Sequence, residues 1–149
     1  MKNSTIRLAV LISILCASCA IPLLTIAQDS VIVTNGVISA AEALWPSIVS
    51  LIPTSQQAQA NKDFNLSILS LSTAESVVQD AVAAGTSTNL VAQLAAVDDA
   101  ITKIVGLIDQ FEAANASGDP RIAAAINELH ARANIAKSKN AAIRAQMVK

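Results

Sequence analysis

The chain has 149 residues, of which 53% are hydrophobic and only 14% are charged, and its mean hydropathy is +0.52. This composition excludes a disordered chain and supplies enough apolar surface for one domain with a core. The formal net charge is −1, and two Phe, one Trp and no Tyr are too few aromatic residues for the base-stacking platforms of single-strand nucleic-acid binders. We therefore expect no nucleic-acid partner.

The first 27 residues have the layout of a secretory signal. Two basic residues make the start positive, residues 8–15 form an uncharged and largely apolar run, and small residues follow at 17–20. The positive end stays inside the cell while the apolar run enters the bilayer. We predict that residues 1–27 are a signal peptide or membrane anchor. Residues 28–149 then form a helical domain in the periplasm or anchored at the cell envelope.

Three fates are open for this leader. Signal peptidase can cut it after Ala20 or after Ala27. Cys19 can instead be lipidated, since the tripeptide that ends there resembles the end of a bacterial lipobox, although Cys16 stands where that pattern has Leu, Val or Ile. The stretch from residue 8 to Ala27 carries no charge. At about 1.5 Å per residue it is long enough to cross a ~30 Å hydrocarbon core as an uncleaved anchor.

Hydrophobic spacing predicts four helices after the leader. The polar residues 28–30 mark the start of the first helix, whose apolar stripe covers residues 37–52. The second helix occupies about residues 55–84 and ends before Gly85, a residue suited to the position just past a helix end. Its expected stripe is Phe64, Ile68, Leu71, Val78 and Val82.

The third and fourth helices have the most regular patterns. Residues 86–88 offer caps for the third helix and Gly118 can close it, while Asp119 and Pro120 suit the cap and first position of the fourth. In both helices the seam residues are spaced alternately four and three apart, the heptad pattern of packed helices. The third seam is Leu90, Leu94, Val97, Ile101, Ile104, Ile108 and Phe111, and the fourth is Ile122, Ile126, Leu129, Ala133, Ala136, Asn140, Ile143 and Met147.

Four helices joined by short loops predict an all-α fold, an antiparallel up-down four-helix bundle preceded by an N-terminal signal or anchor helix. Asn140 is the polar member of the fourth seam. Such a residue costs stability but sets register or partner choice, so we predict that Asn140 sets register inside the bundle or across subunits. The heptad helices pair within one chain, or they drive self-association or binding of a protein partner.

Charged residues are distributed unevenly along the chain. Residues 29–118 carry nine acidic and two basic side chains, and residues 119–149 carry six basic and two acidic ones. The basic segment can dock on the acidic middle of its own chain, or face anionic lipid or another acidic partner. Glu75 interrupts the second stripe, and we expect it at the seam edge or paired with Arg132 or Lys137.

Candidate chemical sites are few. His130 is the single histidine, and it lacks the Glu-x-x-His spacing of di-iron bundles. Asp98, Asp99, Asp109 and Glu112 give the third helix an acidic face, which we expect to be solvated because neighbouring helical residues diverge too far to chelate one ion. Both cysteines lie in the leader, so the helical domain has no disulfide or thiol nucleophile. We expect no metal, no cofactor and no enzymatic activity.

Export without recognisable chemistry favours a non-enzymatic structural or interaction protein of the bacterial cell envelope, with lipidation at Cys19 making it a lipoprotein. One alternative is a membrane-active protein, holin-like or pore-forming, suggested by the positive mean hydropathy and the basic C-terminal segment. Another is a carrier of a small apolar ligand held between the alanine-lined seams. In each case the N-terminal segment is the contact with the membrane.

Overall fold

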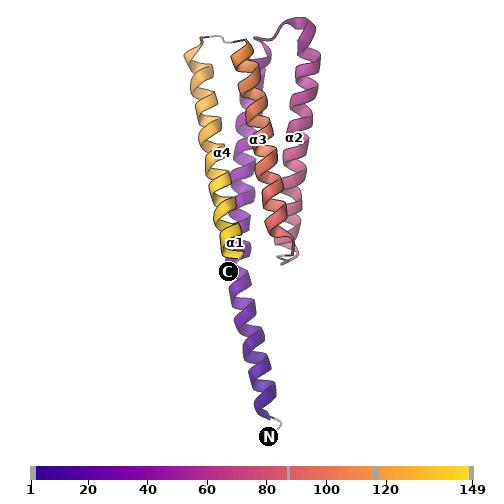
Figure 1. Ribbon diagram of the computed structural model, residues 1–149, viewed down its shortest axis with the longest axis vertical. Helices are drawn as coiled ribbons and strands as arrows, with labels where there is room; N and C mark the ends of the chain where they lie inside the picture. Colours follow the sequence, from indigo (N-terminus) through magenta and orange to yellow (C-terminus); the bar gives the residue numbers. More distant parts are fainter. Residues whose placement is uncertain (1–2, 87, 116–117, 148–149) are drawn as a thin grey trace.

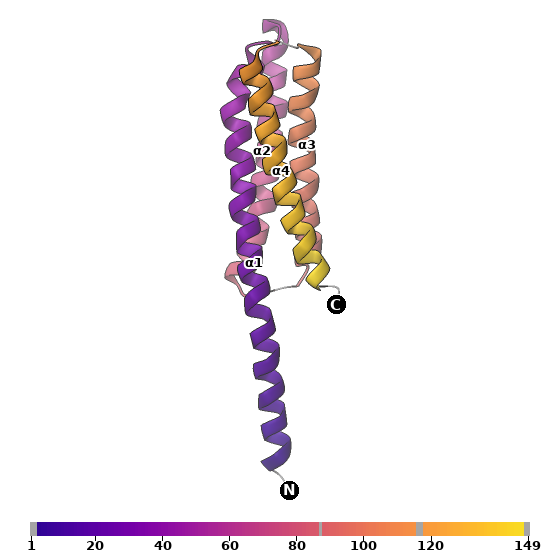
Figure 2. The same cartoon turned by 90° about the vertical axis from the view of Figure 1, so that its left-hand side faces the viewer.

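The computed structural model describes the backbone of residues 3–86, 88–115 and 118–147, and within these ranges the side chains from Thr25 onward. Four helices follow one another: α1 (Asn3–Val49), α2 (Thr54–Ala83), α3 (Leu90–Ala114) and α4 (Pro120–Met147) (Figure 1). Each helix contacts its two neighbours in the order α1, α2, α3, α4 and back to α1. Successive helices run in opposite directions, so the predicted antiparallel up-down four-helix bundle is confirmed (Figure 2).

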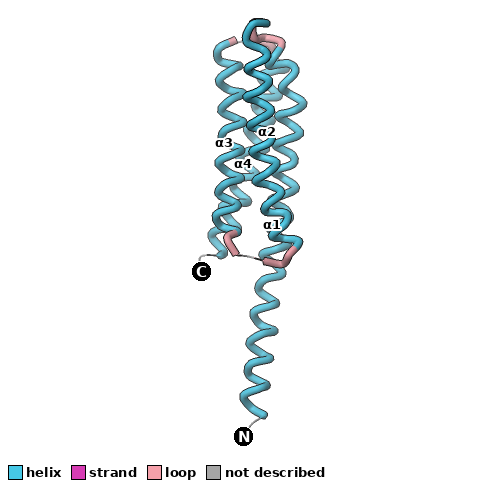
Figure 3. The backbone as a smooth tube through the Cα atoms, turned by 90° about the vertical axis from the view of Figure 1, so that its right-hand side faces the viewer, coloured by secondary structure: helices cyan, strands magenta, loops and turns pink. Residues whose placement is uncertain are grey.

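The helix α1 is far longer than its partners and its first part projects beyond the end of the bundle (Figure 3). The expected helix start at residues 28–30 is wrong, because these residues lie inside α1. Ser30 and Thr34 are both buried, and they extend the buried line of Val37, Ala41, Leu44 and Ile48 back to Ala27 with alternate spacings of three and four. Two short hydroxyl side chains therefore occupy seam positions without interrupting the helix.

The predicted seams form the core. All members of the α3 seam from Leu90 to Ile108 are buried, and Phe111 packs partly buried against them. The α4 seam is buried from Leu129 to Ile143, with its first two members and Met147 partly exposed. The heptad seams of α3 and α4 are thus used within one chain.

The connections show which local predictions succeed. Gly85 has a φ of +67°, and the amides of Gly85 and Thr86 donate to the carbonyls of Val82 and Ala81, which is the Schellman ending of a helix. The side chain of Asp119 accepts the amide of Arg121 at 2.8 Å, so the predicted cap of α4 is confirmed.

Two predicted helix ends are wrong. Among the described residues of the 86–88 segment none caps α3, which begins at Leu90 after Asn89 with a φ of 64° and no side-chain capping bond. The end of α3 is at Ala114, and Gly118, with a φ of +65°, lies later in the connection to α4. The types of residue present therefore predict that a turn lies before and after α3, but they do not predict the residue at which α3 begins or ends.

Candidate functional site

A group of buried and half-buried polar side chains crosses the bundle near the end from which α1 projects. We call Ser30, Asp98, Asn140 and Arg144 the polar layer. Asn140 is 0% exposed; its Nδ2 donates to Oδ1 of Asp98 at 2.7 Å, and its Oδ1 accepts the hydroxyl of Ser30. Nη1 of Arg144 donates to Oδ2 of Asp98 at 2.6 Å. The polar layer thereby ties α1, α3 and α4 together at one level.

Hydrogen bonds within the polar layer satisfy the buried polar atoms of its side chains. The carboxylate of Asp98 receives one neutral and one charged donor, and hydrogen bonds to ionised groups are stronger than neutral ones. Asp98 follows Val97 of the seam and turns toward α4, so the expectation of a solvated acidic face is wrong at this residue. The predicted seam position of Asn140 is confirmed, and its register-setting role stays a prediction.

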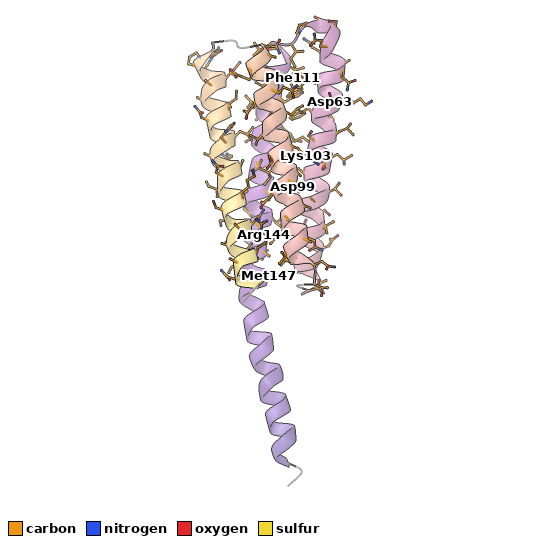
Figure 4. The ribbon with its side chains drawn as sticks, viewed as in Figure 1. Asp63, Asp99, Lys103, Phe111, Arg144 and Met147 are labelled. Carbon is orange, nitrogen blue, oxygen red and sulfur yellow. The ribbon has the colours of Figure 1, made fainter. Side chains whose placement is uncertain are left out.

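The basic C-terminal segment docks on its own chain. Besides Arg144, Lys139 of α4 reaches Asp29 of α1 with an N–O distance of 3.4 Å. Figure 4 places Arg144 near Met147, at the end of α4 beside the projecting part of α1. Two cross-helix ion pairs therefore gather where α1 leaves the bundle.

A second polar contact, between an exposed and a buried side chain, joins α1 to α2. Nδ2 of Asn35 donates to Oε1 of Glu75 at 3.1 Å. Burial raises the pKa of Glu75 above its usual value of 4.5, and the hydrogen bond from Asn35 opposes part of that rise. The expected pairing of Glu75 with Arg132 or Lys137 is wrong, because α2 and α4 are diagonal in the bundle and do not contact each other. Arg132 instead pairs with Glu128 of its own helix at 2.6 Å.

The opposite end of the bundle holds an aromatic cluster. Trp45 stacks on Phe64 with ring centroids 4.3 Å apart and an interplanar angle of 4°, and it meets Phe111 edge-on at 5.7 Å. Nε1 of Trp45 donates to Oδ1 of Asn61 at 2.8 Å, so the one polar atom of the indole ring is satisfied. The cluster joins α1, α2 and α3 through packing.

Surface hollows lie between helices of the described part of the chain. A pocket of about 190 Å³ between α3 and α4 contains the half-exposed pair of His130 and Asp109, whose side chains are 2.8 Å apart. An open groove of about 840 Å³ runs between α1 and α4, and the charged residues on its rim pair with one another. Among the side chains described from residue 25 onward, no three His, Cys, Asp or Glu residues converge as metal ligands.

The sequence predictions missed most of the polar layer. The sequence predicts Ser30 at the start of a helix, whereas Ser30 is buried in the middle of α1 and in phase with Thr34 and Val37. Asp98 and Arg144 gave no such signal, since their pairing depends on the relative placement of α3 and α4. Cys19, the predicted lipidation site, lies in the part of α1 whose side chains are outside the described residues.

The helix α1 contains a segment whose length and composition bear on whether the chain is attached to a membrane. Within the described side chains, the segment Thr25–Val49 is long and apolar enough to cross a membrane, although a third of its most apolar window is buried inside the bundle. Buried core helices and secretion signals pass the same test of length and composition. Comparisons with protein-family models, with curated proteins and with solved structures find no match, so the residues themselves are the guide to function.

Proposed function

We propose that this chain is a non-enzymatic protein of the bacterial cell envelope, held at a membrane by its N-terminal segment, whose bundle acts by binding other protein. The observation that carries the proposal is the continuity of α1, which runs from Asn3 to Val49 without a loop. At about 1.5 Å per residue, the uncharged part from residue 8 to Ala27 measures roughly 30 Å, which matches a ~30 Å hydrocarbon core. The anchor and the bundle then share one helix, and the bundle stands end-on to the membrane.

The packing of the bundle bears on how the leader is processed. Ala27 is fully buried and Ser30 belongs to the polar layer, so a cut after Ala27 would place a new charged terminus next to buried groups. A cut after Ala20, lipidation of Cys19 or an uncleaved helix leaves every contact described from Thr25 onward in place. Of these, lipidation and the uncleaved helix keep the chain at the membrane, and they are the forms that we propose.

The deciding experiment is the intact mass of the chain in membrane and soluble fractions of expressing bacteria, with Cys19→Ser and the control Cys16→Ser. A membrane form that begins at Cys19, carries added acyl mass and disappears only in Cys19→Ser supports a lipoprotein. A full-length membrane form in both variants supports a helical anchor. A soluble form that begins at Ile21 or Gln28, with none in the membrane, contradicts the proposal.

Proteolysis of alkali-washed membranes tests the second half of the proposal. A bundle held by one N-terminal attachment should be released as a soluble, helical fragment. If the helices of the bundle stay protected in the membrane, the chain is a pore-forming or otherwise membrane-embedded protein and the proposal is wrong.

A further inference from the structure

Hydrogen bonds fix the register of the four helices at the level of the polar layer. Asn140 of α4 bonds to both Ser30 of α1 and Asp98 of α3, so these three residues lie at one height along the bundle. The bond between Asn35 and Glu75 aligns α2 with α1 in the same way. Because every helix rises about 1.5 Å per residue, the height of the other residues follows by counting from these bonds.

Beyond the polar layer, toward the projecting part of α1, the bundle is nearly free of charged residues. Residues 81–97, which include the end of α2 and the start of α3, have no charged side chain, and residues 140–147 of α4 have only Arg144. We call the described residues of these stretches, numbers 81–86, 88–97 and 140–147, the foot of the bundle. On all four helices a charged residue borders the foot at the level of the polar layer: Asp29, Asp80, Asp98 and Lys139.

The charged side chain of the foot reaches away from its tip. Arg144 lies four residues beyond Asn140, yet its Nη1 donates to Oδ2 of Asp98, back at the level of the polar layer. The side chain of Val91 is 37% exposed, and the other exposed side chains of the foot are those of Ala, Thr, Asn and Gln. Such an uncharged surface can enter the edge of a bilayer, where a charged surface is costly.

The part of α1 that projects beyond the foot is too short to cross a membrane by itself. Leu90, eight residues before Asp98, lies about 12 Å beyond the polar layer and level with about residue 22 of α1 (Figure 2). The uncharged residues 8–21 ahead of that level span only about 21 Å, against a ~30 Å hydrocarbon core. The missing 9 Å or so corresponds to residues 22–27, which lie beside the foot.

We propose that the foot enters the edge of the membrane and contacts lipid, with its bordering charged residues at the water side. The inference rests on the proposed attachment of the N-terminal segment to a membrane. An uncleaved helix draws the foot about 9 Å into the bilayer, because only then does the uncharged length match the hydrocarbon core. A lipidated Cys19 lies about three residues before the level of Leu90, which sets the foot against the headgroups.

Quenching by brominated lipid tests this placement. The full chain is reconstituted in phosphatidylcholine vesicles with acyl chains brominated near the headgroup, and Trp45→Phe removes the native indole. In this background Val91→Trp and Ala84→Trp each place an indole at an exposed position of the foot, and each should lose more than half of its emission. The matched control is Ile135→Trp on α4, at a residue 52% exposed and about 7 Å on the other side of the polar layer, which should stay unquenched. Far-ultraviolet circular dichroism checks that each variant is helical.

Flotation of the same vesicles separates this inference from the proposed function. If the chain floats with the vesicles and neither indole of the foot is quenched more than the control, the placement of the foot is wrong and the membrane attachment stands. If the chain does not float, both are wrong. Strong quenching at all three positions would show that the charged border lies inside the membrane, and it would also overturn the placement.

Discussion

Asn140→Ala removes the central member of the polar layer. The lost hydrogen bond to the ionised Asp98 is worth about 1.5–3 kcal/mol, and the hydroxyl of Ser30, 1% exposed, loses its partner at a cost of about 1–3 kcal/mol. Some relaxation is expected, so we predict a loss of about 3 kcal/mol in the free energy of unfolding. For a domain of this size that lowers Tm by roughly 12 °C, at ~4 °C per kcal/mol.

Chemical unfolding followed by far-ultraviolet circular dichroism measures this loss. The control is Asn134→Ala, an exposed asparagine on the same helix, which should change stability by less than about 0.5 kcal/mol. Adding Ser30→Ala to Asn140→Ala should cost little more, because the stranded hydroxyl is removed with it. If Asn140→Ala costs no more than Asn134→Ala, the polar layer does not stabilise the bundle and the reasoning is refuted.

Four further substitutions test other parts of the bundle. Burial raises the folded-state pKa of Glu75, so its contribution to stability is full below pH 4.5 and is lost as pH rises through the raised value. Glu75→Gln should flatten this pH dependence and stabilise the chain at neutral pH in urea titrations. An unchanged pH profile of stability would contradict this prediction. Trp45→Ala should cost about 3–5 kcal/mol in the same titrations, and a loss below about 1 kcal/mol would show that the aromatic cluster is unimportant. Gly106→Ala, inside α3 with open space at the added Cβ, should stabilise the chain by about 0.5–1 kcal/mol. Gly85→Ala, at a φ of +67°, should destabilise it by about 1–2 kcal/mol. Equal effects of the two substitutions in thermal melts would refute the different backbone roles of these glycines.

Periodicity predicts most of this fold because the bundle is held together by seams that repeat along each helix. The α3 and α4 seams could be listed residue by residue before their packing was known. Polarity alone puts the start of the first bundle helix at residues 28–30, whereas the position of these residues in the helical repeat places Ser30 on the buried side. Ser30 and Thr34 lie in phase with Val37, and a small hydroxyl fits a seam that a larger polar group would disrupt.

Side-chain partners were harder to predict than seams. The pairing of Glu75 with Asn35, and of Asp98 with Arg144, depends on which helices are adjacent and how far each is shifted along its axis. A heptad pattern predicts which face of a helix is buried, but it does not predict which other helices pack against that face. The cap at Asp119 was predictable because all of its atoms come from consecutive residues.

All three aromatic residues of the chain are in contact at one end of the bundle: Trp45, Phe64 and Phe111. Intrinsic fluorescence therefore reports on that end alone, and the end that carries the polar layer contributes no emission of its own. If the polar layer opens before the aromatic end, the fluorescence trace will show nothing while the helical signal falls. Overlaying the two traces shows whether the long bundle unfolds as one unit or opens first where α1 leaves it.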